Sequence, residues 1–211
     1  METNRHINIQ PIRRYGVDKR TFAEPYVDDT TRDFIIANEL LWNPITRRYD
    51  CNGSVRVLSD LLLHGKLKIR FGVIKNCFDC SGIGMFSLEG CPTEVSGYFD
   101  CGNNYLTSLF GAPMKVEGFF GCEHNELHSL EYSPKYVGGD FYCHNNLLEN
   151  LVGSPEYVDG DYICNNNKLK SIEGLPKTVN GNFLFDKSQS HLIPVDKPSW
   201  LKGNFKENDI Y

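Results

Sequence analysis

The sequence has little of what is typical of exported, membrane-bound or nucleic-acid-binding proteins. No long apolar run follows its polar N-terminus, so we expect neither a signal peptide nor a membrane span, and we predict a cytoplasmic location with no membrane partner. Basic charge is scarce along the middle of the chain, because residues 79–182 carry 14 acidic residues against 5 basic ones, a net of −9. Direct nucleic-acid binding is therefore not expected there.

Familiar catalytic motifs are also missing. The sequence has no phosphate-binding glycine loop, no nucleophile elbow, no H-E-x-x-H and no paired C-x-x-C motif. His124, His128 and His144 could be drawn with Glu123 and Glu126 as a metal or acid–base cluster, but a histidine at such variable surface positions is usually only solvated. The prediction is a protein that is not an enzyme and that uses no cofactor and no metal.

What the sequence does have is a period of 21 residues. Five cysteines keep this period, namely Cys80, Cys101, Cys122, Cys143 and Cys164. Aromatic residues two positions before the cysteines follow the same period, as do leucines, prolines and Val-x-Gly pairs. A fixed period of about 20–29 residues predicts stacked coils, with the repeated apolar residues along one continuous core.

One unit shows how a coil is expected to run. Residues 95–101 alternate as in a strand with one inward face, so we expect each coil to contribute one strand to a parallel sheet. A polar turn follows at 102–104, Leu106 and Leu109 return to the core, and a proline closes the coil. The predicted fold class is an α/β-type or mostly β solenoid, a right-handed leucine-rich-repeat-like coil with a parallel concave sheet.

The cysteine ladder allows three interpretations. Small apolar thiols can fill the narrow axis of the coil, which is the favoured one. Disulfides between neighbouring coils are disfavoured because the Cβ vectors run parallel and the compartment is expected to be reducing. A metal bound by Cys77 and Cys80 is disfavoured because residues an odd number apart on a strand point to opposite faces. Three residues after the cysteines, a ladder of asparagines is expected to bond backbone groups of successive turns: Asn104, Asn125, Asn146 and Asn167.

The chain is predicted to have three segments. Residues 1–50 form an N-terminal arm and a capping helix at about 29–42, because Asp28 to Asp33 supply N-capping side chains and acid for a first helical turn. Residues 51–205 form the solenoid, and 206–211 form a C-terminal tail. Residues 1–27 could pack as an extended arm, bind the partner or be mobile, and the sequence leaves these alternatives open.

The repeat carries a family resemblance. The pattern C-x-x-N-x-L-x-x-L, as in Cys101 to Leu109, resembles the leucine-rich repeat, with cysteine in a core-leucine position. Units such as 139–146, with the sequence GDFYCHNN, more closely resemble the leucine-rich-repeat-like proteins of tailed bacteriophages. This resemblance covers residues 50–205 and implies a solenoid in the cytoplasm of an infected bacterium; most proteins of the family have no assigned activity. Single rungs depart from the pattern at Ile83, Glu131, Tyr132 and His191.

The candidate partner-binding surface is the outward side of the predicted sheet. Aromatic and acidic residues share it at positions that flank each inward ring. The predicted contact residues are Tyr98, Asp100, Phe119, Glu123, Asp140, Tyr142, His144, Asp161 and Ile163. Exposed aromatic anchors surrounded by carboxylates are typical of protein interfaces, although good strand formers can also simply cover a solvated sheet.

These observations predict a protein-binding solenoid. The resemblance implies a phage-encoded protein, and the partner is expected to be a bacterial host protein, such as a defence or regulatory factor, that the solenoid occludes or redirects. The first alternative is an acidic decoy that mimics nucleic acid, which the −9 of the repeats favours. The second alternative is a structural component of the virus particle. The oligomeric state is left open.

Overall fold

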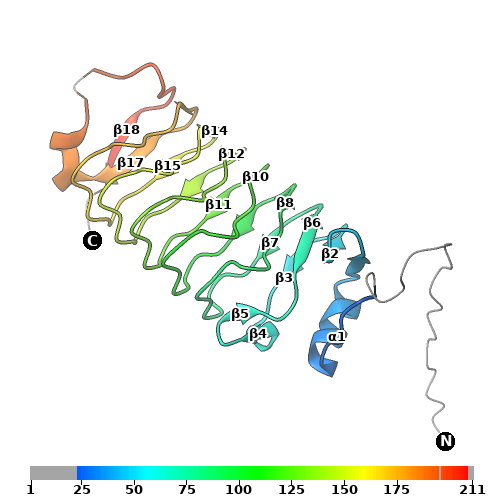
Figure 1. Ribbon diagram of the computed structural model, residues 1–211. Helices are drawn as coiled ribbons and strands as arrows, with labels where there is room; N and C mark the ends of the chain where they lie inside the picture. Colours follow the sequence, from blue (N-terminus) through cyan, green and yellow to red (C-terminus); the bar gives the residue numbers. More distant parts are fainter. Residues whose placement is uncertain (1–22, 195, 209–211) are drawn as a thin grey trace, which may run out of the picture.

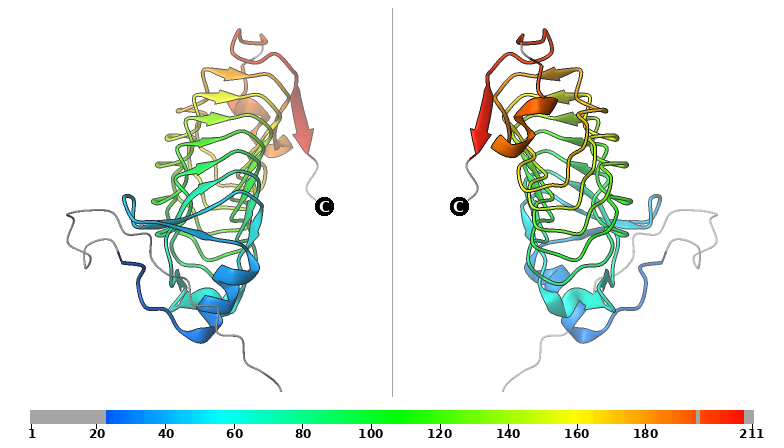
Figure 2. Two further views of the ribbon diagram at one scale, coloured as in Figure 1. Left: turned by 90° about the vertical axis from the view of Figure 1, so that its right-hand side faces the viewer. Right: turned by 90° about the vertical axis from the view of Figure 1, so that its left-hand side faces the viewer.

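The computed structural model describes residues 23–194 and 196–208, and these form a parallel β-solenoid with a helix at its N-terminal end (Figure 1). Two further views show the coils stacked one on another between the N-terminal helix and the last strand (Figure 2). The predicted solenoid with parallel strands and a helical N-terminal cap is confirmed. Among the described residues, no helix is both long and apolar enough to cross a membrane.

The coils build two sheets of eight strands each, on two sides of the solenoid. The first sheet contains, in spatial order, β1 (Leu41–Asn43), β2 (Arg48–Cys51), β6 (Phe71–Ile74), β8 (Glu94–Val95), β10 (Lys115–Val116), β12 (Tyr136–Val137), β14 (Tyr157–Val158) and β16 (Thr178–Val179). The second contains β3 (Val55–Arg56), β7 (Phe78–Asp79), β9 (Phe99–Asp100), β11 (Phe120–Gly121), β13 (Phe141–Tyr142), β15 (Tyr162–Ile163), β17 (Phe183–Asp186) and β18 (Phe205–Asn208). A small hairpin pairs β4 (Leu62–Leu63) with β5 (Lys66–Leu67), and two short 3-10 helices lie at Ser59–Leu61 and Lys187–Leu192.

The prediction of one strand per coil was wrong, because most coils contribute two. In the coil of residues 94–100, Ser96 to Tyr98 turn a corner between β8 and β9. The corners stack backbone on backbone: a Cβ on Gly97 would lie 2.8 Å from the carbonyl carbon of Asn76 in the corner before it. Only glycine permits this approach without displacement, which explains why a glycine follows each valine by two residues.

Aromatic rings stack along the core, one from each coil. Neighbouring centroids in the series Phe78, Phe99, Phe120, Phe141, Tyr162 and Phe183 lie 5.1–5.7 Å apart, and the ring planes differ by at most 30°. Every ring in the series is fully buried. Each stacked pair is worth about 0.5–1.5 kcal/mol beyond the area that it buries, so register is favoured at every step.

One rung shows how the core tolerates a polar atom. Tyr162 stands in the phenylalanine series, and its hydroxyl lies 2.8 Å from the hydroxyl of Ser154, which in turn donates to the Leu151 carbonyl at 2.6 Å. The equivalent residue one coil earlier, Ser133, bonds backbone instead. A buried hydroxyl without such a partner would cost about 1–3 kcal/mol, so the serine makes the tyrosine acceptable.

The cysteines lie where the axial interpretation places them. All eight are free thiols, and seven of them are buried. From Cys101 to Cys164, the sulfurs of the repeats donate to a carbonyl of the next coil, as Cys101 does to Gly121 at 3.1 Å and Cys122 does to Tyr142 at 3.3 Å. Burial raises the pKa of these two thiols well above the ordinary value, so they remain protonated and able to donate.

The asparagine ladder also takes its predicted role. The Nδ2 of Asn146 donates to Cys122, Cys143 and His144 carbonyls at 3.0–3.3 Å, and its Oδ1 accepts from the Leu127 backbone N–H at 3.1 Å. Asn104, Asn125 and Asn167 bond in the same way. One side chain thus satisfies backbone groups of two or three turns that would otherwise be buried without partners.

The N-terminal cap is shorter than predicted. Helix α1 spans Asp29–Ala37 and not 29–42, and it begins where Asp28 accepts from the Thr31 N–H at 2.8 Å. It ends because Glu39 takes a left-handed conformation (φ 51°), after which β1 pairs antiparallel with β2. Phe34, Ile35 and Leu40 are buried against the core and close the first coil.

Both predicted solenoid boundaries also need correction. At the start, β2 already pairs in parallel with β6, so the coils begin at Arg48, three residues before the predicted 51. At the end, residues 206–208 are not a tail, because they continue β18, which pairs with β17 and places Phe205 in register with Phe183. This pairing covers the edge that β17 would otherwise expose. The predicted arm lies outside the described residues up to 22, and so do 209–211.

The asparagine ladder yields a stability prediction. Asn146→Ala leaves three buried carbonyls and one N–H with fewer partners, so we expect the free energy of unfolding to fall by about 2 kcal/mol or more and the Tm by roughly 4 °C or more. Thermal denaturation followed by circular dichroism measures this. Asn52→Ala, at an exposed position outside the ladder, is the control. Equal Tm values for the two variants would remove the ladder from the account of stability.

The thiols yield a second prediction. Iodoacetamide should modify only Cys77 in the native protein, because this half-buried thiol lies on a corner whereas the other seven are buried. Mass spectrometry after labelling with and without denaturant counts the modified residues. Rapid native labelling of Cys101, Cys122 or Cys143 would contradict an axial position for these side chains.

Candidate functional site

A row of aromatic side chains runs along one corner of the solenoid and onto the second sheet. Tyr98 stacks on Phe119 with centroids 4.5 Å apart and planes 7° apart, and Phe119 meets the edge of Tyr142 at 5.6 Å. His144 lies 6.2 Å from Tyr142 and 5.6 Å from His124. The structure therefore joins four of the predicted contact residues, with His124, into one unbroken series of rings, which we call the aromatic row.

The rings are accessible from solvent because they occupy outward positions on the corner and on the strand of the second sheet. Tyr98 and Phe119 occupy the last corner position before an inward ring, and Tyr142 is the outward residue of β13. Tyr98, Phe119, Tyr142 and His144 are half-buried, and His124 is exposed. Half-buried aromatic side chains keep a fixed orientation while they retain surface for a partner.

The outward column of the second sheet changes character along the solenoid. Cross-strand register aligns Asp79, Asp100, Gly121, Tyr142, Ile163 and Leu184. The column begins with two acidic residues, Asp79 and Asp100, and its last three residues, from Tyr142 to Leu184, are aromatic or aliphatic. Ile163, a predicted contact residue, thus lies between Tyr142 and Leu184 and continues the apolar surface from the aromatic row.

Two carboxylates meet at the centre of this column. A Cβ on Gly121 would lie 3.0 Å both from Oδ1 of Asp100 and from Oε2 of Glu123, so these carboxylates fill the space that a side chain would take. Burial raises the pKa of both carboxyl groups. The negative charge of Asp79 raises the pKa of Asp100 further, and the negative charge of Asp100 raises that of Glu123. The Glu123 Oε2 is buried and has no hydrogen-bond partner within the described part of the chain.

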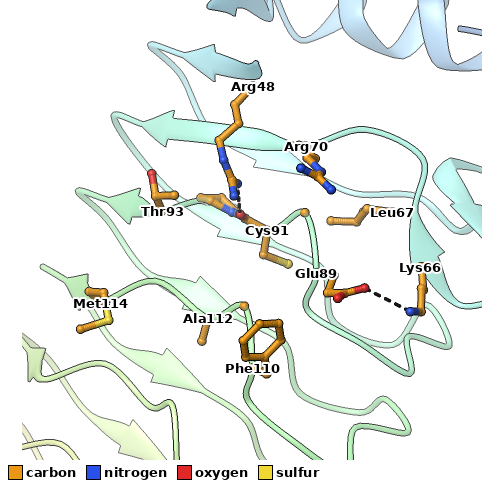
Figure 3. Close-up of a pocket in the computed structure, with 13 residues that line it drawn as sticks. Arg48, Lys66, Leu67, Arg70, Glu89, Cys91, Thr93, Phe110, Ala112 and Met114 are labelled. Atoms are coloured by element: carbon orange, nitrogen blue, oxygen red, sulfur yellow. Dashed lines mark hydrogen bonds and ion pairs between the residues drawn. The ribbon is translucent and has the colours of Figure 1, made fainter. Parts of the chain in front are cut away.

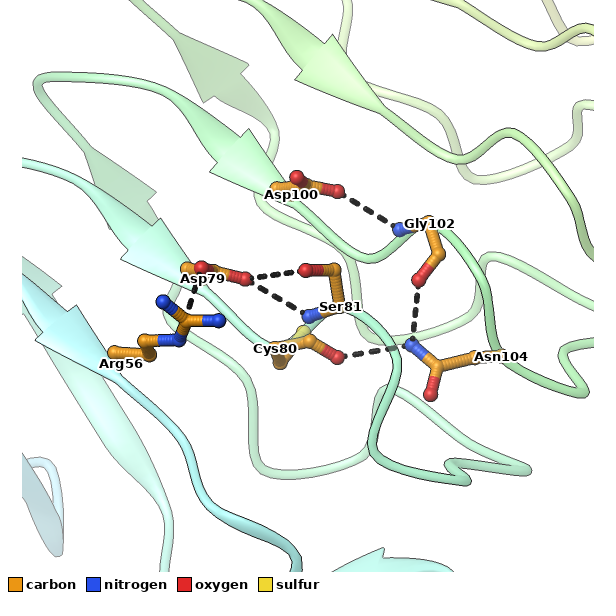
Figure 4. Close-up of polar contacts among 7 residues, drawn as sticks. All are labelled: Arg56, Asp79, Cys80, Ser81, Asp100, Gly102 and Asn104. Carbon is orange, nitrogen blue, oxygen red and sulfur yellow. Dashed lines mark hydrogen bonds and ion pairs between the residues drawn. The ribbon is translucent and has the colours of Figure 1, made fainter.

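The acidic residues nearer the N-terminus are tied into the turns. Asp79 accepts from the backbone N–H and the hydroxyl of Ser81 at 3.0 and 2.7 Å, and Arg56 approaches it at 3.5 Å (Figure 4). Asp100 accepts from the Gly102 N–H at 2.9 Å. These bonds hold the carboxylates at the end of each strand, beside the asparagine turns.

Asp140 and Asp161, two predicted contact residues, have a structural role that the sequence did not reveal. Asp140 accepts from the Asp161 N–H at 2.7 Å and from the Tyr142 hydroxyl at 2.7 Å. Asp161 in turn accepts from the Asn182 N–H at 2.6 Å. They secure successive corners, and burial together with the Asp140 bond raises the pKa of Tyr142 to about 12, which keeps its hydroxyl a donor.

His124 and His144 pack against each other at one end of the aromatic row. Burial and the neighbouring His124 lower the pKa of His144, which favours its neutral form at neutral pH. Within 23–194 and 196–208, no group of three or more His, Cys, Asp or Glu side chains is arranged to hold a metal ion. The candidate site consists of rings, aliphatic side chains and carboxylates.

A second feature lies on another corner and was missed by the sequence analysis. Near the N-terminal end, side chains from three coils line a hollow of about 470 Å³ (Figure 3). The N-terminal hollow, as we call it, includes Arg48, Lys66, Arg70, Glu89, Phe110 and Met114. The sequence contained one indication of this basic hollow, namely the net charge of the N-terminal part. Residues 1–78 carry 13 basic residues against 9 acidic ones, whereas the repeats are acidic.

Comparisons of the chain with protein-family models, with curated proteins and with solved structures found no match.

The carboxylate pair yields a prediction about pH. Folding raises the pKa values of Asp100 and Glu123, so the folded state binds their protons more tightly than the unfolded state does. The two carboxyl groups therefore favour folding at low pH, where they are protonated. They destabilise the folded state as the pH rises through the raised pKa values. Glu123→Gln should therefore raise the Tm at pH 7, and the gain should shrink toward about pH 4, near the ordinary pKa of glutamate.

Thermal denaturation of both proteins at the two pH values measures this difference. Glu126→Gln, which changes an exposed glutamate close by in the chain, is the matched control. A lower Tm of Glu123→Gln at pH 7 would mean that the glutamate makes a net stabilising contact.

Proposed function

We propose that this chain is a protein-binding solenoid that docks its partner on the aromatic row and on the adjoining apolar half of the second sheet. The observation that carries the proposal is the unbroken series of half-exposed rings from Tyr98 to His144, continued by Ile163 and Leu184. Aromatic residues are the side chains most enriched at the energetic centres of protein interfaces. The carboxylates of Asp100 and Glu123 lie beside this centre and favour a partner with basic side chains around an apolar patch.

The proposed partner is a bacterial host protein, and the proposed effect is to occlude or redirect it. Support for this part comes from the repeat sequence, which resembles the leucine-rich-repeat-like proteins of tailed bacteriophages and implies action in the host cytoplasm. A solenoid suits occlusion, since its stacked coils offer an extended rigid surface. A defence or regulatory factor is the proposed type of target.

A second candidate is an acidic decoy for a nucleic-acid-binding protein. The net charge of −9 over residues 79–182 favours this candidate. The partly exposed Asp79, Asp100 and Glu123 at one end of the outward face favour it as well. Ionic strength separates the two candidates, because a contact made mainly of charges weakens steeply with salt, whereas one centred on apolar rings weakens little.

The aromatic row yields a prediction about binding. Phe119→Ala combined with Tyr142→Ala should abolish stoichiometric capture of the host partner from bacterial lysate, because it removes the middle of the row. Truncation of two central aromatic anchors costs about 2 kcal/mol or more each, which is at least about a thousandfold in affinity together. Affinity capture followed by mass spectrometry measures the loss.

The chain supplies a matched control for this experiment. Phe86 and Tyr105 also stack, at 5.4 Å, and both are exposed. They lie in the segment of each coil that carries the buried leucines after the asparagine turn, which we call the leucine side. Phe86→Ala with Tyr105→Ala should leave capture intact, and both double variants should keep the circular dichroism spectrum of the parent. Capture that survives the first pair and is lost with the second would place the contact surface on the leucine side.

A further inference from the structure

The N-terminal hollow has two chemically distinct sides. Arg48, Lys66 and Arg70 come from the first coils and supply positive charge on one side, whereas Phe110 and Met114 from later coils form an apolar side (Figure 3). Phe110 and Met114 are 55% and 62% exposed, so their apolar surface is open to a ligand. Such a hollow fits a ligand that combines negative charge with an apolar group.

The charges of the hollow are not balanced internally. Lys66 pairs with Glu89 at 3.1 Å, and Arg48 donates to the Phe71 and Cys91 carbonyls at 2.7 and 3.2 Å. Arg70 is exposed, and its guanidinium has no hydrogen bond or ion pair with any residue that the structure describes. Three cations against one carboxylate leave an excess of positive charge, and Arg70 is the group free to bind an anion bidentately.

The apolar side continues along the corner to Tyr132. The ring of Tyr132 meets Phe110 edge-on at 5.4 Å and is 59% exposed. Its backbone is left-handed (φ 71°), at the position where other coils place Gly90, Gly111, Gly153 and Gly174, all with positive φ. A tyrosine costs about 1–2 kcal/mol in this conformation relative to glycine, and the edge contact of its exposed ring with Phe110 offsets only part of that cost. A costly residue with an exposed ring indicates a role outside the fold itself.

We propose that this corner binds an acidic peptide segment of a partner protein, with a carboxylate on Arg70 and apolar side chains on Phe110, Met114 and Tyr132. Charge complementarity selects an acidic ligand. A nucleic acid strand fits less well, because a phosphate chain leaving the hollow would meet Glu89 and then the net −9 of the repeats. The hollow lies on the corner that precedes the first sheet, whereas the aromatic row begins on the corner between the two sheets, so the two contacts are independent.

The test begins with a random peptide display library selected against the full chain. Selected peptides should combine Asp or Glu with Leu, Ile, Phe or Trp. The dissociation constant of a labelled selected peptide is then measured by fluorescence anisotropy. Arg70→Glu should weaken binding about tenfold or more, through loss of a charge-assisted hydrogen bond and added repulsion. Lys168→Glu makes the same charge change at an exposed position on the leucine side and should alter the affinity less than about twofold.

Tyr132→Gly separates a binding role from a structural one. It restores the residue type of the other coils, so the Tm should not fall, whereas the affinity for the selected peptide should fall severalfold. A lower Tm with unchanged affinity would show that the tyrosine serves the fold alone and would overturn its part in the proposal.

The same variants also identify other ligands of the hollow. Failure to select acidic peptides, or equal binding of them by Arg70→Glu, would overturn the proposal. Binding of a labelled single-stranded oligonucleotide that is lost in Arg70→Glu would assign the hollow to nucleic acid. Self-association seen by light scattering and lost in this variant would assign it to a second copy of the chain. The variants of the aromatic row leave the hollow unchanged, so failure of either proposal is recognisable separately.

Discussion

In-register stacking of equivalent residues is the constraint on which the rest of the structure depends. The four central coils each place a ring, a thiol and an asparagine directly above those of the previous coil, and the ring series extends one coil further at each end. The stacked rings differ by at most 30° in orientation. A change in coil length would move all three ladders out of register at once, leaving buried carbonyls without the asparagine that serves them. The constant 21-residue period is therefore a consequence of the hydrogen bonds and ring contacts between coils.

The sequence predicted the features that this constraint repeats. The solenoid, its cysteine and phenylalanine core and the backbone role of the asparagines all follow from the period, because every coil solves the same packing problem. The second sheet was missed because Val95, Gly97 and Phe99 alternate across a corner just as they would along one strand, and alternation alone does not distinguish the two. The end of the helix depended on a left-handed Glu39, a conformation that its residue type does not favour.

The candidate surfaces were less accessible to sequence analysis, for two physical reasons. Residue type does not show what a carboxylate bonds: Asp140 and Asp161 have the composition of an interface, yet each accepts an N–H of the following coil. The N-terminal hollow joins Arg48, Arg70 and Phe110, which no period relates, so only the folded chain brings them together. The aromatic row was predictable in outline, since its members occupy outward positions fixed by the same period as the core.

Some residues that depart from the repeat have their energetic cost offset by a neighbouring side chain, and others do not. Tyr162 is compensated, because Ser154 supplies a partner for its hydroxyl. The buried Oε2 of Glu123 has no hydrogen-bond partner among the described residues. The left-handed Tyr132 is compensated only in part, by the edge contact of its exposed ring with Phe110, and both residues lie at or beside a candidate surface. In a fold that repeats one solution so closely, a cost that recurs in no other coil is more informative than exposure or residue type alone. Since neighbouring coils are only about 4.8 Å apart, a single such departure is placed in a defined relation to the side chains above and below it, and this lets a uniform scaffold carry local and distinct contact surfaces.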